Sequence, residues 1–413
     1  MMTPTRRLVY RFFFQTVLLL FLLALVTLWN TLRLSPPLNT FAHLLRHLTI
    51  LTGLLGGGLY IATTYRTDNQ IADETALRVA AGLWTILLLV ALIAGLSGQL
   101  PSWLTLLLVV NLTILLTLIG RIAPHAPVIH LWLLGLGISA AGMLLGLLPP
   151  ANEVQVYLLP ALITNLQFNV AYPLAAVALG FWLMHRFSNI TPDWANRSLY
   201  SVAAFIVLAG TLVSLAPLAA LSTPDWVEIV SNCALFIIPV ACWMVAAHSY
   251  RALSDRNATH TLAAHWFSLA LLLLLLGPGF LGALQTPFVV SRWTLGTRLT
   301  AIQHTLTAWM PIALSLGVIN QAAAEMRGRN WRVTGLIPFW LVSFGIIGLG
   351  LAESGAGLVQ TYLERIVGLP FAEVQRLLTP LDTLAAVGWL SVILGIAIYT
   401  LTLWLRRPRS TVE

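Results

Sequence analysis

Two histidines occupy similar places in two separate hydrophobic segments of the chain. His47 lies about one helical turn inside the segment 43–65, and His304 lies about one turn inside the segment 299–322. Two neutral imidazoles on facing helices can fill both axial positions of a haem iron. The pair therefore suggests a low-spin haem, although two polar residues that hydrogen-bond across helices would give the same pattern. His43, one turn outside His47, is expected to play a supporting role or none.

Arginines and glycines accompany both histidines. Arg46 directly precedes His47, and Arg292 and Arg298 precede His304. A guanidinium pairs well with a carboxylate, so these arginines could bind haem propionates, or they could lie in solvated loops. Glycines let either a porphyrin or a neighbouring helix approach the backbone closely, and four of them follow His47, namely Gly53, Gly56, Gly57 and Gly58.

The elements that hold these residues are expected to cross a membrane. Of the 413 residues, 58% are hydrophobic and 9% are charged, and the mean hydropathy is +0.87. This composition excludes a soluble globular domain, whose surface needs charge. Hydrophobic runs of about 20 residues recur along the chain, and in lipid such a run satisfies its backbone groups only as a helix.

These runs predict an all-α polytopic membrane protein with a single transmembrane domain over residues 1–413. The first span follows three arginines and lacks a small-residue cleavage site, so we expect a retained helix rather than a signal peptide. The longest connection, 353–379, could hold a short surface helix. About twelve spans are expected, at 12–30, 43–65, 79–96, 103–120, 128–148, 157–184, 199–221, 229–249, 262–284, 299–322, 334–352 and 380–404.

The arginines predict how the chain is oriented. All 22 basic residues are arginines, and with twelve spans 16 of them fall on the side of the two termini and 6 on the other. Because basic residues accumulate in cytoplasmic loops, both termini are predicted to be cytoplasmic, in a cell (inner) membrane. The net charge of +8 then reflects topology rather than binding to nucleic acid.

The remaining ionisable residues give weaker signals. Six further histidines lie near cytoplasmic helix ends, where imidazole tips reach headgroups or water. Glu353 and Asp382 lie near the outer ends of their spans and are expected to be interfacial carboxylates, with a proton or quinone contact at Glu353 as the alternative. Cys233 and Cys242, nine residues apart within one span, fit neither a disulfide framework nor a CxxC site.

Several long segments resemble one known family. The segments TPDWVEIVSNCALFIIPVACWM, QHTLTAWMPIALSLGVI, IPFWLVSFGIIGLGLAESGAGLVQ and PFAEVQRLLTPLDTLAAVGWLSVILGIAIYTLTLW are similar in order and texture to spans seven to twelve of the haem-copper oxidase catalytic subunit (subunit I). HLTILTGLLGGGLYIATTY is similar to its second span. The closest branch is that of the C-type cytochrome c oxidases and nitric oxide reductases. The resemblance covers nearly the whole chain and implies a low-spin haem between His47 and His304.

The chain departs from this family where the oxygen-reactive centre should be. Ile302 stands at the position of the high-spin haem ligand, and Gln167 or Phe168 stands at that of a copper ligand. Leu218 and Ala219 stand where the family carries a His-His pair. Leucine, alanine and isoleucine offer no donor atom to copper or haem iron. The resemblance therefore implies a degenerate member that lacks the binuclear centre.

These observations lead to one expected function and two alternatives. We expect one low-spin, bis-histidine haem b without copper, serving one-electron transfer or structural support in a respiratory-chain complex rather than enzymatic reduction of oxygen or nitric oxide. Expected partners are other membrane subunits, the lipid bilayer and a periplasmic or extracellular cytochrome c or cupredoxin-like protein, but no nucleic acid. The alternatives are an active terminal cytochrome c oxidase or nitric oxide reductase, and a cofactor-free membrane scaffold or transporter.

Overall fold

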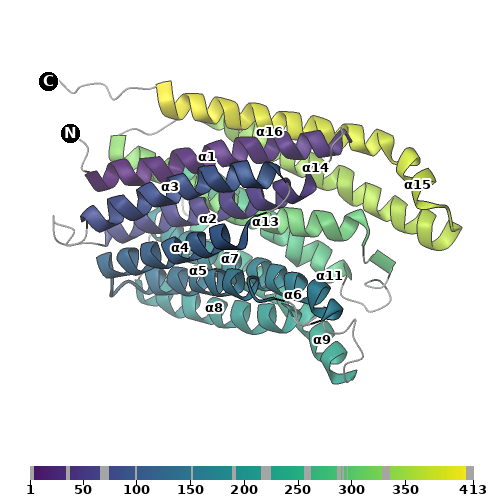
Figure 1. Cartoon of the computed structure of the whole chain (residues 1–413), viewed down its shortest axis with the longest axis horizontal. Helices are drawn as coiled ribbons and strands as arrows, with labels where there is room; N and C mark the ends of the chain where they lie inside the picture. Colours follow the sequence, from purple (N-terminus) through teal and green to yellow (C-terminus); the bar gives the residue numbers. More distant parts are fainter. Residues whose placement is uncertain are drawn as a thin grey trace.

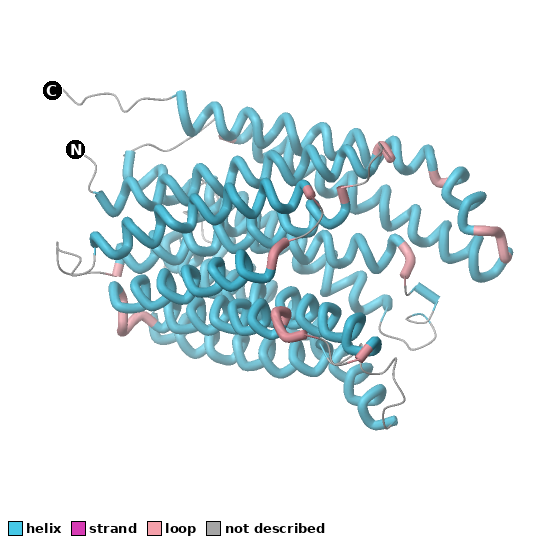
Figure 2. The backbone as a smooth tube through the Cα atoms, viewed as in Figure 1, coloured by secondary structure: helices cyan, strands magenta, loops and turns pink. Residues whose placement is uncertain are grey.

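The protein is a bundle of long helices. A computed structural model of the chain describes residues 4–33, 38–65, 74–97, 100–149, 152–187, 192–214, 225–254, 262–285, 290, 293–294, 296–327 and 335–405. Within these ranges the backbone is helical apart from short turns, and it contains no strand (Figure 2). The prediction of an all-α, multi-pass membrane protein is confirmed at this level.

A helix, or a continuous run of helices, is present at each predicted span. Among the described residues, ten are long and apolar enough to cross a membrane, and two shorter apolar helices, Leu199–Ser214 and Phe236–Tyr250, lie within α8 and α9. The count of twelve spans therefore stays a prediction. The helices are α1 (Pro4–Thr31), α2 (Asn39–Thr64), α3 (Glu74–Leu96), α4 (Ser102–Ile122), α5 (Pro127–Leu145), α6 (Glu153–Leu166), η1 (Gln167–Ala171), α7 (Tyr172–Phe187), α8 (Pro192–Ser214), α9 (Asp225–Leu253), α10 (Leu262–Leu274), η4 (Leu275–Leu281), α11 (Gly282–Gln285), α13 (Arg298–Arg327), α14 (Leu336–Tyr362), η5 (Leu363–Val367), α15 (Phe371–Leu377) and α16 (Thr379–Leu405).

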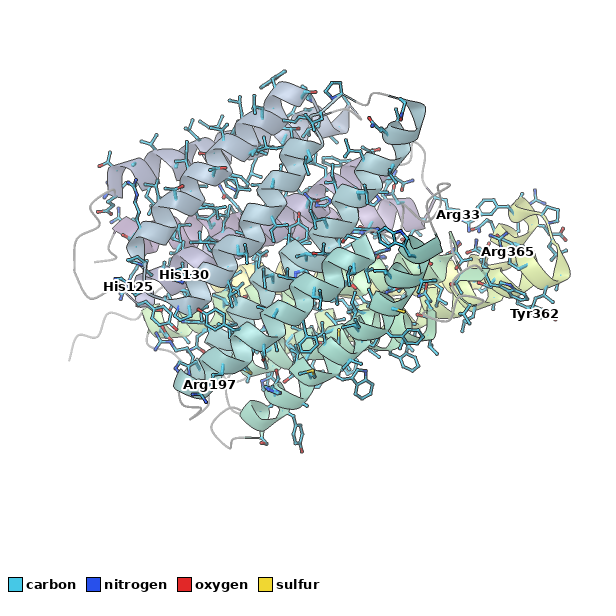
Figure 3. All side chains as sticks on the ribbon, turned by 90° about the horizontal axis from the view of Figure 1, so that it is seen from below. Arg33, His125, His130, Arg197, Tyr362 and Arg365 are labelled. Atoms are coloured by element: carbon cyan, nitrogen blue, oxygen red, sulfur yellow. The ribbon has the colours of Figure 1, made fainter. Side chains whose placement is uncertain are left out.

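Both ends of the described chain lie at one end of the bundle (Figure 1). The start of α1 and the end of α16 are found there, and His125 and His130 lie at the end of the bundle opposite Arg33 (Figure 3). This arrangement agrees with an even number of crossings. We call the end that holds Arg33 the outer end, following the predicted orientation.

Five helices close into a ring. α1 packs on α2, α2 on α13, α13 on α14, α14 on α16, and α16 again on α1. Lipid provides no hydrophobic force between helices, so close packing of small residues has to hold such a ring together. At the α14–α16 contact, a Cβ on Gly345 would lie 2.7 Å from the carbonyl oxygen of Gly388, so the two backbones touch.

The glycines that follow His47 serve helix packing. A Cβ on Gly58 would lie 2.2 Å from the indole ring of Trp132, and one on Gly57 would lie 3.2 Å from the side chain of Leu179. The same ring of Trp132 donates a hydrogen bond of 2.9 Å from Nε1 to the carbonyl oxygen of Leu54. Of the two readings of these glycines, the structure supports close approach of neighbouring helices, and α2 runs through them unbroken.

The last connection on the outer side differs from the sequence-based expectation. α14 continues to Tyr362 instead of ending near residue 352, and the chain then turns through η5 and α15 into α16. Gly368 ends η5 with φ at +77°, a left-handed conformation that glycine adopts at low cost. The expected short helix exists as α15, but it belongs to a projection beyond the outer ends of the other helices (Figure 1).

Candidate functional site

One contact fixes the register of the two helices that carry the predicted ligands. The first turns of α2 and α13 line the same cavity, and deeper in the bundle a Cβ on Gly53 would lie 2.8 Å from the hydroxyl of Ser315. The helices therefore run in the same direction. His304 lies 11 residues before Ser315, and 11 residues before Gly53 is Ala42 (315 − 304 = 53 − 42).

This register sets the depths of the histidines. With a rise of about 1.5 Å per residue, His43 lies within about 1.5 Å of the level of His304, whereas His47 lies about 7.5 Å deeper. His304 is also near enough to His43 and Arg46 to interact with both electrostatically. The sequence predicts His47 as the residue opposite His304, but the packing favours His43.

His47 already has a partner from another helix. Its Nδ1 lies 2.7 Å from the hydroxyl of Tyr172, and the ring also contacts Phe168, with centroids 5.2 Å apart. The hydroxyl can accept from a protonated Nδ1 or donate to a bare one. An axial histidine is commonly oriented by a hydrogen bond at Nδ1, but a plain polar contact between helices has the same geometry.

His43 and His304 are in a different situation. His304 is half-buried, while His43 is exposed. Within the described ranges, neither ring takes part in a hydrogen bond. Two imidazoles without partners, at one level on neighbouring helices, have the nitrogen lone pairs that a shared iron requires.

A cavity lies beside His43. Its volume is about 340 Å³, and all five helices of the ring contribute to its wall. We call it the polar outer cavity, because charged side chains gather around it. They include His43, Arg46, Arg298, Glu353 and Asp382, together with the apolar Ile302.

The arginines predicted to bind propionates differ in the partners that they have within the protein. Arg298 binds the carboxylate of Asp382 at short distance, donates from Nη2 to Oε1 of Gln375 at 2.7 Å, and lies 3.7 Å from Glu353. Arg33 binds Asp382 as well. Arg298 therefore has carboxylate and amide partners inside the protein, and its binding to a propionate stays a prediction.

Arg46 contrasts with Arg298. It is half-buried and lines the polar outer cavity, and among the described residues it forms neither a hydrogen bond nor an ion pair. Leaving a guanidinium without a partner is costly where water is scarce. Of the two predicted arginines among the described residues, Arg46 is thus the one whose side chain remains available to an anionic group. Arg292 lies outside the described residues.

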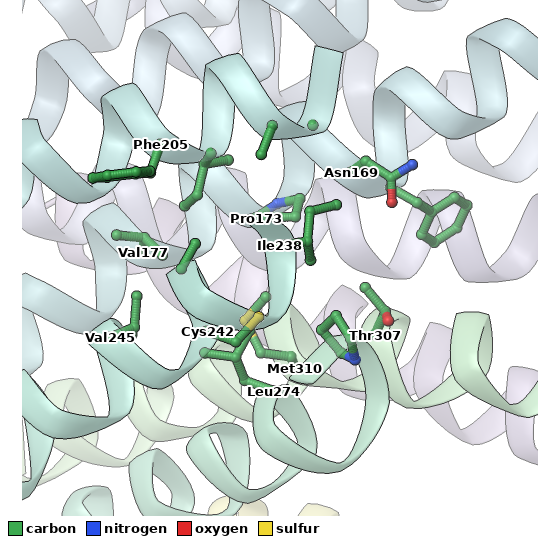
Figure 4. A pocket seen from close by; sticks show the side chains of 16 residues that line it. Asn169, Pro173, Val177, Phe205, Ile238, Cys242, Val245, Leu274, Thr307 and Met310 are labelled. Carbon is green, nitrogen blue, oxygen red and sulfur yellow. The ribbon is translucent and has the colours of Figure 1, made fainter. Parts of the chain in front are cut away.

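A second, smaller cavity lies between η1, α7, α8, α9, α10, η4 and α13 (Figure 4). Its volume is about 50 Å³, and we call it the apolar inner cavity. Phe168 lies in its wall, together with Asn169, Cys242, Pro278, Thr307 and Met310. Gln167, the other residue at the copper position, is buried near Gly142 on α5, and Ile302 lines the polar outer cavity. Leu218 and Ala219 lie outside the described residues.

Comparison with known proteins adds no relative. No protein-family model matches the chain, and no curated protein matches it. The likeness to haem-copper oxidases thus stays a resemblance read from the sequence. Among the described residues, no group of three or more His, Cys, Asp or Glu side chains is placed to hold a metal ion, but a bis-histidine iron needs only two.

Proposed function

We propose that the chain is a haem-binding membrane subunit that holds one low-spin haem b between α2 and α13, near the outer end of the bundle. His304 of α13 and a histidine of α2 would hold its iron. The observation that carries the proposal is that His43, in the wall of a cavity of about 340 Å³, and His304 lie at one level and form no hydrogen bond within the described ranges.

The geometry favours His43 as the ligand from α2. His47 lies about five residues deeper than His304, and its Nδ1 is engaged with Tyr172. The family resemblance implies His47 instead, so both residues belong in the test. In either case the two ligands come from neighbouring helices of the five-helix ring.

The residues present fit the anionic edge of such a group. Arg46 has the unpaired guanidinium that a propionate would need, and Arg298 adds positive potential although its hydrogen bonds are used by Asp382 and Gln375. A bis-histidine haem supplies reversible one-electron chemistry and leaves no open position on iron. The chain's own part is to fix both imidazoles and to balance the charge at the outer end.

The role that follows is electron transfer, or support of a respiratory complex, from the outer side of the membrane. The polar outer cavity lies at the end where an outer partner would approach. A periplasmic or extracellular cytochrome c or cupredoxin-like protein is the partner that the resemblance implies. The second candidate is a cofactor-free scaffold, which the His47–Tyr172 contact and the tightly packed glycines of α2 would suit equally.

The test is haem analysis of the purified full chain, produced in cells that make haem. A pyridine haemochrome assay should find one haem b per chain, and the reduced-minus-oxidised spectrum should be low-spin and unchanged by carbon monoxide. Two haems with a carbon monoxide shift would indicate an active oxidase or reductase. A chain that folds without haem would leave only the scaffold.

A further inference from the structure

Two arginines lie on the outward face of α1, at the end of the bundle that holds the termini. Arg7 and Arg11 are four residues apart, so they share one face of the helix, and both are exposed. Within the described ranges neither forms a hydrogen bond or an ion pair. Phe14 and Leu18, 41% and 45% exposed, continue the same face. This face therefore changes from charged to apolar within one helical turn.

A hydrogen bond places α3 beside this face of α1. Nε2 of Gln15 on α1 donates to Oγ1 of Thr85 on α3 at 2.7 Å. Both helices run opposite to α2, as the close contacts of the glycines of α2 and α3 show, and are therefore parallel to each other (Figure 1). Seven residues before each partner lie Leu8 and Arg78 (15 − 8 = 85 − 78). Arg7 thus lies within about 1.5 Å of the level of Arg78.

The neighbouring surface of α3 adds a third arginine and an open space. Arg78 and Gly82 lie seven and three residues before Thr85, so they turn toward the same side of α3. Arg78 donates to Glu74 at 2.9 Å, but a guanidinium has five N–H donors and this side chain is 50% exposed, so further donors remain available. At Gly82 an added Cβ would meet nothing within 4 Å. The open space lies one turn from Arg78 and about level with Arg11.

Apolar side chains continue the seam between the two helices beyond the arginines. Leu89 of α3 is 56% exposed. It lies four residues after Thr85, and Leu18 lies three residues after Gln15, so the two leucines are within about 1.5 Å of one level. A group of cations followed by an apolar seam matches the two parts of a phospholipid, its charged headgroup and its acyl chains. A soluble anion would use only the arginines.

Other arginines at this end of the bundle lack such surroundings. Arg121, in the last turn of α4, and Arg197 of α8 are exposed, but neither has the second arginine one turn away that Arg7 provides for Arg11. Arg186 is engaged with Glu325 at 3.7 Å and with the ring of Trp182. A general excess of positive charge at the cytoplasmic side, which membrane proteins share, does not account for the arrangement on α1 and α3.

We propose that the surface between α1 and α3 binds an anionic phospholipid of the leaflet at this end of the bundle. Arg7, Arg11 and Arg78 hold its phosphate, and an acyl chain lies along Leu18 and Leu89. Guanidinium groups pair well with phosphate, and basic surfaces between membrane helices on the cytoplasmic side suit anionic headgroups. We call this surface the α1–α3 lipid site. The inference is independent of the proposed haem.

Lipid titration of the purified full chain, followed by native mass spectrometry, tests the site. Dioleoyl phosphatidylglycerol should bind with a dissociation constant about tenfold lower than that of dioleoyl phosphatidylcholine, and Arg7→Gln combined with Arg11→Gln should remove most of the difference. Arg121→Gln combined with Arg197→Gln is the matched control, because it removes the same charge from exposed positions at the same end (Figure 3). Equal binding of both lipids to the parent chain, or equal losses in the two double variants, would overturn the proposal.

A second experiment separates a bound lipid from a bound free anion. Gly82→Leu fills the open space near Arg78 without changing the charge, so it should raise the dissociation constant of phosphatidylglycerol by about threefold or more. Gly348→Leu is the control, since a Cβ there also meets nothing within 4 Å but lies on α14. Inorganic phosphate in about hundredfold excess over the lipid should not displace it, because phosphate lacks acyl chains. Displacement by phosphate, or an unchanged constant in Gly82→Leu, would contradict the assignment.

Discussion

The guanidinium of Arg298, at the start of α13, binds the carboxylate of Asp382, which lies 84 residues further along the chain in the first turn of α16. Gln375 of α15 accepts from the same guanidinium, and Arg33 reaches both Gln375 and Asp382 from the end of α1. The carboxylate of Asp382 and the amide of Gln375 thus join α1, α13, α15 and α16 at the outer rim of the five-helix ring.

Removing that carboxylate should destabilise the protein. Asp382→Asn removes the anion that Arg33 and Arg298 share and leaves Arg298 only the longer, 3.7 Å pair with Glu353. Since the side chains of Arg298 and Asp382 are only 19% and 12% exposed, we expect a loss of about 1–3 kcal/mol. Thermal unfolding of the detergent-purified chain measures it. Glu74→Gln, which breaks the more exposed Glu74–Arg78 pair, should cost less than about 0.5 kcal/mol. Equal losses would mean that Asp382 and its two arginines stabilise the protein no more than the exposed Glu74–Arg78 pair does.

The histidine ligands can be told apart by substitution. His304→Ala should abolish the low-spin spectrum, because it removes the ligand from α13. His43→Ala should do the same if the register set by Gly53 and Ser315 decides the site, and His47→Ala should then retain haem. His130→Ala, at the other end of the bundle, is the control. Loss of haem in His47→Ala alone would show that the sequence-based choice was right and the register argument wrong.

Tyr172→Phe gives an independent readout of the same choice. It removes the hydroxyl 2.7 Å from Nδ1 of His47 at a stability cost of about 0.5–1.5 kcal/mol. If His47 binds iron, its basicity changes and the reduction potential must move. If His43 is the ligand, potential and spectrum should stay as they are. Tyr399→Phe, which removes another buried tyrosine hydroxyl bonded to Asn320, controls for the general effect of losing such a bond.

Arg46 should tune the potential of the proposed site. Arg46→Gln removes an unpaired positive charge beside the polar outer cavity, which favours the oxidised, more positive form of the iron. The midpoint potential should therefore fall in redox titrations. Arg33→Gln provides the comparison, because its charge is already compensated by Asp382, and it should move the potential less. A rise in potential in Arg46→Gln would contradict the placement.

Packing predicts that two glycines, Gly58 on α2 and Gly137 on α5, differ sharply in how well they tolerate replacement by alanine. Gly58→Ala would put a Cβ about 2.2 Å from the ring of Trp132, so the variant should lose about 2 kcal/mol or fail to accumulate. Gly137→Ala meets nothing within 4 Å and should be neutral or slightly stabilising. Expression level and thermal unfolding report both. A Gly58→Ala variant as stable as the parent would mean that α2 can shift away from α5.

The helices could be predicted because lipid allows a long apolar segment hardly any other structure. The outer ends of the helices were harder to predict. Residues such as Glu353, Ser354 and Gly355 look like the start of a loop, although α14 continues to Tyr362. The site depends on contacts between helices, which a hydropathy pattern does not predict. The partner of Arg298 lies 84 residues away, and the level of His43 follows from the Gly53–Ser315 contact. Both emerge only when the helices are packed.

The ring that surrounds the polar outer cavity joins α1 to α16, the first and last helices of the described chain. During synthesis α1 and α2 enter the membrane long before α16 does. Until α16 arrives, the cavity lacks one wall and Arg298 lacks its carboxylate. Any group that occupies the cavity meets a wider opening while this gap persists, and insertion of α16 then completes the wall. The order in which the helices are made therefore determines when the five-helix ring is completed, and α16 completes it.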